Sequence, residues 1–146
     1  MIEAKFLTEL ETRQLNDKEV VLLAPLRYQS AILGGIVEVE KGFVSDGSSV
    51  PRVPFAYWFY GGRAHHEGVL HDRFYRSPNH EIRVLYPDGS NLSTFIPKNV
   101  ADTVFAEAMC VREKGIFLRG PMYWGVKFGG MSSYITGPKR FRIIPI

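Results

Sequence analysis

The chain lacks several features that would assign it to a class at once. Its only cysteine is Cys110, which excludes an intramolecular disulfide. No run approaches the ~18 apolar residues of a membrane span, and Glu3 and Lys5 interrupt the start where a secretory signal would be apolar. Basic residues form no long run: 18 lysines and arginines face 15 acidic residues, a net charge of +3. We therefore expect a soluble protein of a reducing cytoplasm, with no membrane association and no specific nucleic-acid binding.

Aromatic residues, in contrast, are plentiful. The 146 residues include ten Phe, seven Tyr and two Trp, and 45% of the chain is hydrophobic. This composition supplies a substantial core. Internal repeats, low-complexity tracts and linkers are absent from the sequence, so we expect one domain, 1–146.

The front of the chain has strand-like patterning. Valines alternate with glutamates from Val37 to Glu40, as in a half-buried strand, and Asn16-Asp17 and Gly34-Gly35 mark breaks. Two short apolar runs flank the turn formers of residues 87–91, which predicts a hairpin. The predicted strands are residues 5–10, 19–23, 36–44, 82–86, 92–96 and a last strand over the tail, 140–146.

The back of the chain has helical patterning. Residues 65–75 read as a helix that stops before Ser77-Pro78, and residues 99–114 repeat apolar positions at helical spacing. Pro121 predicts the start of a third helix that ends at Gly129-Gly130. We predict an α+β fold, in which a small antiparallel sheet from the N-terminal half packs with about three helices from the C-terminal half.

Three short motifs occur in order along the chain. They are Gly-Phe-Val-Ser-Asp-Gly-Ser-Ser-Val-Pro-Arg at 42–52, His-Asp-Arg-Phe-Tyr-Arg at 71–76, and a spaced set from Ala101-Asp102 to Gly129-Gly130. Together they resemble the phage and prophage family known as domain of unknown function 1353. The resemblance implies a protein of tailed phages or prophages, encoded among late genes for tail or lysis functions. It implies no established activity.

Each motif supplies polar residues that suit acid–base chemistry. A carboxylate that binds an imidazole fixes its tautomer and raises its basicity, so Asp46 or Asp102 could orient His71 as a general base. Ser48 or Ser49 could then act as a nucleophile, although a serine in a turn is usually a backbone cap. The candidate catalytic residues are Asp46, His71, Asp72 and Asp102.

The same residues could instead bind a metal ion, but we favour this less than metal-free acid–base catalysis. His71-Asp72, with His66 and Asp102, invites comparison with HD phosphohydrolases, where such residues hold metal ions. His66 and His71 are five residues apart, however, so on a helix they point about 140° away from each other. The same spacing argues against a zinc-protease helix, whose histidines lie four apart. We expect no cofactor and leave a divalent metal as the alternative.

The same residues also have purely structural explanations. Asp46 could cap its own turn, Asp72 could pair with Arg76 four residues later, and Asp102 could favour the first turn of its helix through the dipole. His71 and Tyr75 share a helix face and could close a buried network that joins the helix to the Asp46 loop. Arginines that could satisfy these carboxylates are Arg52, Arg76 and Arg119.

Two segments are candidates for contact with other molecules. Five aromatic residues lie between Val53 and Gly62, more than a short segment easily buries, which suggests an interface with larger phage proteins. Its candidate binding residues are Arg52, Tyr57, Trp58, Phe59 and Tyr60. Lys139, Arg140 and Arg142 near the end form an exposed strand face or a phosphate-contacting patch.

Two functions remain in competition. The first is a virion, tail-associated or assembly component that docks onto other phage structural proteins, made in the host cytoplasm and carried in the virion. The second is a small hydrolase with an Asp/His site that acts on peptidoglycan or a phosphoester. A third, a factor acting on host defence, has no supporting residue. An open cleft at Asp46, His71 and Asp102 would favour chemistry, and enclosure would favour a scaffold.

Overall fold

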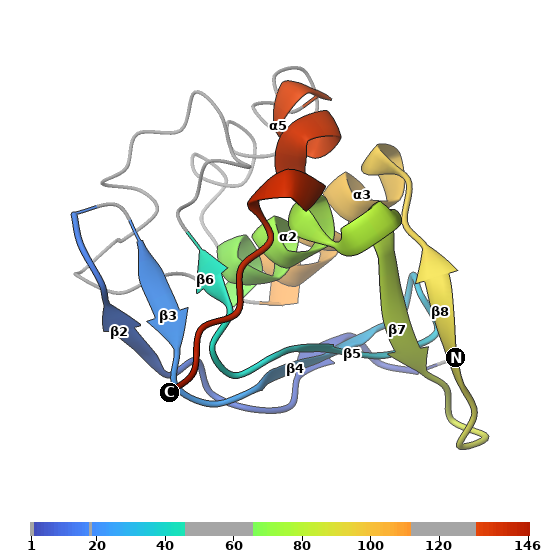
Figure 1. The fold of residues 1–146 in the computed structure, drawn as a ribbon. Helices are drawn as coiled ribbons and strands as arrows, with labels where there is room; N and C mark the ends of the chain where they lie inside the picture. The colour runs from blue at the N-terminus through green and yellow to red at the C-terminus, as the bar shows by residue number, and fades with distance from the viewer. Residues whose placement is uncertain (1, 18, 46–65, 112–130) are drawn as a thin grey trace.

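The computed structural model describes residues 2–17, 19–45, 66–111 and 131–146, drawn in colour in Figure 1. Two of the three motifs are therefore only partly described. The predicted helix from Pro121 and the aromatic segment 53–62 lie outside the described residues.

The larger sheet has five antiparallel strands and combines both halves of the chain. Its strand order is β1 (Lys5–Phe6), β4 (Leu26–Ser30), β5 (Gly35–Val39), β7 (Glu81–Leu85) and β8 (Asn91–Phe95). The β7–β8 hairpin turns at the predicted Pro-Asp-Gly segment, where Gly89 has a φ of 88°. The β5 alternation is confirmed: Val37 and Val39 are buried and Glu38 is exposed.

A second sheet of three short strands lies beside the first. Its order is β2 (Thr12–Gln14), β3 (Val20–Leu22) and β6 (Val44–Ser45). The β-type segment predicted over residues 36–44, with its break at Lys41-Gly42, is divided there: the chain turns and crosses from β5 to this second sheet. Strands β2 and β4 were not predicted, and the strand expected over residues 5–10 extends only over Lys5–Phe6.

Two helices provide most of the packing against the larger sheet. Helix α2 (His66–Arg76) ends just before Ser77-Pro78, as predicted, and α3 (Lys98–Val111) begins after Pro97. The predicted end of α3 at Lys114 lies outside the described residues. A short helix α5 (Met131–Thr136) leads into a 3₁₀ turn, Gly137–Arg140.

The C-terminal tail corrects a prediction. Instead of a strand over residues 140–146, the 3₁₀ turn runs to Arg140, and the tail forms a single bridge, Phe43 with Ile143. Pro138 favours the helical turn and cannot donate to a ladder. The tail is nevertheless fixed to β6, because the Val44 amide donates to the Arg142 carbonyl (3.1 Å) and the Ile144 amide to the Gly42 carbonyl (2.9 Å).

The core lies between the five-stranded sheet and the helix pair, which Figure 1 shows on one side of that sheet. The fold is α+β, as predicted. Buried side chains of the sheet and of the two helices form one cluster, which includes Leu26, Tyr28, Val37, Val39, Val84, Leu70, Phe74, Val104 and Phe105.

Candidate functional site

All eleven residues of α2 are buried, including its charged ones. A charge is stable inside a protein only when it is paired and hydrogen-bonded, so each polar side chain of α2 needs a partner on a neighbouring element. Different faces of the helix meet different neighbours. His71 and Tyr75 face α3, Asp72 and Arg76 face β6, and Arg73 faces the end of β5.

Asp102 is the centre of the contact between α2 and α3. Its Oδ1 lies 2.9 Å from Nε2 of His71 and accepts a hydrogen bond from the Tyr75 hydroxyl at 2.5 Å. Its Oδ2 accepts from Nζ of Lys98, one turn earlier on α3, at 2.7 Å. His71 is fully buried and Asp102 is 2% exposed, so the group is closed to solvent.

These bonds determine the ionisation of the carboxyl group. Burial by itself would raise the pKa of Asp102, but the hydrogen bond and electrostatic interaction with His71, with the bonds from Lys98 and Tyr75, hold that pKa below its usual value. Burial, followed by the bond to Asp102, raises the pKa of Tyr75. Asp102 is therefore an anion at neutral pH, and Tyr75 remains a protonated donor.

This arrangement predicts a pH dependence of stability. The pKa of Asp102 is lower in the folded chain than the usual value of about 3.9 in the unfolded chain, so its contribution is full above that value and is lost as pH falls through the folded pKa. We expect urea unfolding midpoints to fall more between pH 5 and pH 3 for the wild type than for Asp102→Asn. Equal slopes for the two proteins would contradict the assignment.

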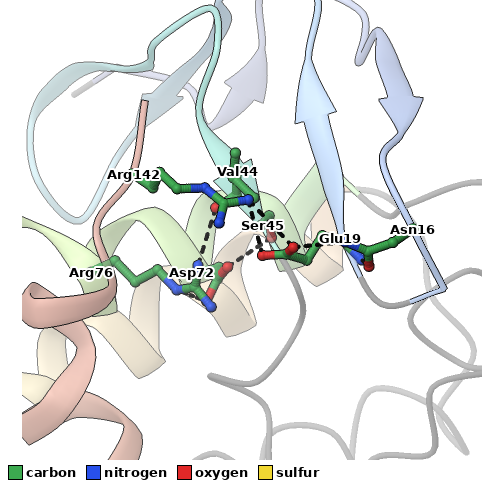
Figure 2. A network of polar contacts seen from close by, with 7 residues as sticks. All are labelled: Asn16, Glu19, Val44, Ser45, Asp72, Arg76 and Arg142. Atoms are coloured by element: carbon green, nitrogen blue, oxygen red, sulfur yellow. Dashed lines mark hydrogen bonds and ion pairs between the residues drawn. The ribbon is translucent and has the colours of Figure 1, made fainter. Parts of the chain in front are cut away.

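Asp72 forms a separate network with the three-stranded sheet (Figure 2). The Ser45 hydroxyl donates to its Oδ2 at 2.7 Å, and Nε of Arg76 lies 3.4 Å from its Oδ1. Nη1 of Arg76 also donates to the Val44 carbonyl at 3.2 Å. The predicted pairing of Asp72 with Arg76 is confirmed, and both side chains tie α2 to β6.

Two further ties were not found from the sequence as part of the site. Arg73 donates two hydrogen bonds to Glu40, at 2.8 Å from Nε and 2.7 Å from Nη2, and its guanidinium lies 4.7 Å from the Phe141 ring centroid. Such a fork is the strong form of an Arg–carboxylate contact. The signal was present, because Arg73 belongs to the second motif, but its partner lies 33 residues earlier.

Glu107 provides the other tie, between α3 and β4. Its Oε1 accepts from the Tyr28 hydroxyl (2.7 Å) and from the Ser30 hydroxyl (2.9 Å), and its Oε2 accepts from the Ile32 amide (3.1 Å). Burial and the bond to Glu107 together raise the pKa of Tyr28. Glu107 is part of the third motif, and its spacing there did not reveal this role.

Of the candidate catalytic residues, the structure brings His71 and Asp102 together and places Asp72 in a different network. Asp46 and all five candidate binding residues, Arg52, Tyr57, Trp58, Phe59 and Tyr60, lie outside the described residues. One explanation needs correction. Asp102 is not in the first turn of α3, since the helix begins at Lys98 and the carboxylate is turned towards α2. The predicted His71–Tyr75 network is present and joins α2 to α3, and its predicted link to the Asp46 loop lies outside the described residues.

His66 and His71 do not converge in the manner of a metal site. His66 Nε2 accepts a hydrogen bond from the Leu10 amide at 3.1 Å, on the N-terminal segment, whereas His71 faces α3. Over residues 2–17, 19–45, 66–111 and 131–146, no group of three or more His, Cys, Asp or Glu side chains is placed to hold a metal ion.

A cleft of about 570 Å³ lies on the other face of the five-stranded sheet. Its lining includes both basic and acidic side chains, and none of His71, Asp72 and Asp102 contributes to it. Arg27 and Glu38 form an ion pair there at 3.5 Å, with both side chains substantially exposed. Arg73 and Glu40, which tie α2 to the end of β5, also line this cleft, whereas the Asp102 and Asp72 networks do not reach it.

The chain is thus a mixed α+β domain. Polar residues from all three motifs form the hydrogen bonds and ion pairs that hold its helices to its sheets and to each other. The family model described as protein of unknown function (DUF1353) matches residues 20–126, and the chain belongs to this family. No curated protein and no solved structure matches the chain. Among the helices that the structure describes, none has the length and apolar character to cross a membrane.

Proposed function

We propose that this chain is a phage-encoded docking protein, a virion, tail-associated or assembly component that binds a larger phage protein. The observation that supports a non-catalytic role is the enclosure of His71, Asp72 and Asp102, which are 0%, 0% and 2% exposed. Each is engaged by a neighbouring element and not directed at a described cleft. The phage setting is supported by the family resemblance.

Strand β8 (Asn91–Phe95) is the docking surface that we propose among the described residues. In that part of the chain it pairs only with β7, so it is an edge strand. Edge strands usually carry charges or proline, which prevent pairing with other chains, and β8 carries neither. Leu92 is 60% exposed and Phe95 is 57% exposed. Among the described residues, no other strand covers this edge.

The backbone of β8 has the alternation that strand addition needs. Just beyond the two ends of β7, the Tyr86 amide donates to the Ser90 carbonyl and the Ile96 amide donates to the His80 carbonyl. In an antiparallel ladder, hydrogen-bonded positions alternate with outward ones, so the peptide groups of Asn91, Ser93 and Phe95 point away from β7. A partner strand would bind these three residues through their main chain.

The side chains of β8 favour pairing with a strand of a different protein over pairing with β8 of a second copy of this chain. Antiparallel self-pairing over all five residues is centred on Ser93 and places Leu92 opposite Thr94 and Phe95 opposite Asn91. Neither apolar side chain would then meet an apolar one. We therefore assign the edge to an uncharged strand of a different protein, with apolar residues opposite Leu92 and Phe95.

Particles assembled with altered chains test this proposal. We expect wild-type chain to be found in purified virions by mass spectrometry and the variant Leu92→Lys/Phe95→Lys to be depleted at least about tenfold, because charges at an edge oppose strand addition. The matched control is Ile135→Lys, an equally exposed apolar position on α5. Absence of wild-type chain from virions, or equal incorporation of all three proteins, would contradict the docking role.

A second candidate function rests on one atom. Nε2 of His71 contacts Asp102, while its Nδ1 has no hydrogen-bond partner in the part of the chain that the structure describes. If Nε2 carries the proton, Nδ1 holds a free lone pair, and a carboxylate-oriented imidazole with a free nitrogen is the arrangement of a general base. This is the feature that favours a small hydrolase of peptidoglycan or a phosphoester.

Single substitutions separate the two functions. A hydrolase should lose about 100-fold or more of its rate on peptidoglycan or a phosphomonoester in His71→Gln, because the base is removed. The comparison variant is Asp72→Asn, which alters the neighbouring network and leaves the imidazole in place. If both variants remain folded and retain full biological function, the hydrolase hypothesis fails.

A further inference from the structure

The C-terminal tail forms a second cleft, close to α2 and the three-stranded sheet. It has a volume of about 330 Å³ and is lined by Glu19, Arg76, Lys139, Arg140, Phe141 and Arg142. Four of these six side chains are cationic and one is anionic. We propose that this cleft binds a phosphate group, either as the free ion or as a small phosphate monoester.

The backbone that carries the cations is held in place. The Arg142 carbonyl and the Ile144 amide bond to β6 and to Gly42, respectively. Gly137, at the start of the 3₁₀ turn, lies so close to the Tyr75 carbonyl that no side chain would fit there. The tail is thus fixed both to the end of α2 and to β6, which positions the basic side chains before any ligand arrives.

The buried wall of the cleft is Arg76. It is 2% exposed and is held by the Val44 carbonyl and by Asp72 (Figure 2). Asp72 offsets the charge of this one guanidinium. A buried charge is screened less by water than an exposed one, so it attracts an anion more strongly. Arg76 therefore contributes to the attraction of an anion into the cleft without a change in its position.

The outer wall is made of side chains that can turn towards a ligand. Arg142 lies 3.3 Å from both carboxylate oxygens of Glu19, and its side chain is 50% exposed, so this contact is weak. Glu19 is held independently by the amide of Asn16 at 2.8 Å. Lys139 is exposed and makes no hydrogen bond or ion pair with the described residues. Arg142 can therefore exchange Glu19 for a phosphate.

The chemistry of the cleft favours phosphate over a carboxylate. The described lining carries four cations and one carboxylate, and Lys139 and Arg142 are exposed, which favours an anion such as phosphate. Guanidinium forks bind phosphate oxygens in pairs. The volume is at the small end for ligand pockets, which suits a phosphate group with a small substituent.

Calorimetric titration of the full chain at low ionic strength tests the site, with inorganic phosphate and phenyl phosphate as probes and phenol as the uncharged control. We expect saturable binding of roughly millimolar affinity or tighter, and about tenfold weaker binding in Arg142→Gln, because one charge-assisted contact is lost. Lys139→Gln should weaken binding about threefold. Arg83→Gln, which removes an exposed arginine on β7 that lines the other cleft, should bind as the wild type does.

The two probes also separate the sources of the phosphate. Tighter binding of phenyl phosphate indicates a monoester ligand, and equal or weaker binding indicates the free ion; either result supports the site. No saturable binding of either probe would overturn the proposal. So would equal affinities of the Arg142→Gln, Lys139→Gln and Arg83→Gln variants.

Discussion

Replacing Asp102 with alanine is expected to lower the free energy of unfolding by roughly 3–5 kcal/mol, the usual range for breaking a buried ionic pair. The carboxylate accepts from three side chains, and its loss leaves the buried groups of His71 and Tyr75 without their acceptor. Since whole domains are stable by only about 5–15 kcal/mol, this one change would remove much of the margin. Urea unfolding at pH 7 measures the loss.

Two further variants identify the cause. Asp102→Asn keeps the side-chain shape and one acceptor oxygen, so it should lower the free energy of unfolding less than Asp102→Ala does. The difference between the two losses measures what the shape and the remaining hydrogen bonds contribute without the charge. Asp17→Ala changes an exposed aspartate in the turn between β2 and β3 and should shift the unfolding free energy by no more than about 0.5 kcal/mol. Equal losses at Asp17 and Asp102 would show that the buried network contributes no special stability.

Replacing Gly42 with alanine is expected to destabilise the fold by roughly 3 kcal/mol. Gly42 has a φ of 89°, which costs an L-residue about 1–2 kcal/mol. An added Cβ would also collide with the Ile144 carbonyl, so the tail would have to move and its bond to the Gly42 carbonyl would weaken. Unfolding by urea gives the total, and hydrogen exchange at the Ile144 amide reports the tail itself.

Gly89 provides the matched control. It has nearly the same φ, 88°, at the tip of the β7–β8 hairpin, and an added Cβ there would meet nothing within 4 Å. Gly89→Ala should therefore show only the backbone cost, about 1–2 kcal/mol. A Gly42→Ala loss no greater than that of Gly89→Ala would mean that the tail tolerates displacement, and the phosphate cleft would then lack a rigid wall.

The sequence located the elements whose signals are local. Helix α2 was found because Ser77-Pro78 stops it, and the β7–β8 hairpin was found because Asp88-Gly89 separates two alternating segments. Strand β4 was missed although its signal was there, since Leu26 and Tyr28 point inward and Arg27 and Gln29 do not. Strand β2 has no such signal: Thr12, Arg13 and Gln14 are polar, and only their pairing with β3 makes them a strand.

The tail shows the opposite error. Its alternating basic and apolar residues have the period of a strand, but the described part of β6, Val44–Ser45, already pairs with β3 on one side. Among the described residues, the tail forms one bridge, between Phe43 and Ile143. Periodicity describes which way side chains point, and a ladder needs a partner strand of matching length.

By itself, the sequence determined that α2 carries Asp72 and Arg76 on one face and His71 and Tyr75 on another, because helical spacing fixes faces within one element. Only the tertiary structure decided which residues meet these faces: Asp102 lies 31 residues from His71, Ser45 lies 27 residues from Asp72, and Glu40 lies 33 residues from Arg73. The physical reason is that partners so distant are chosen by how the sheets and helices pack. That choice is a property of the whole core and not of any local pattern.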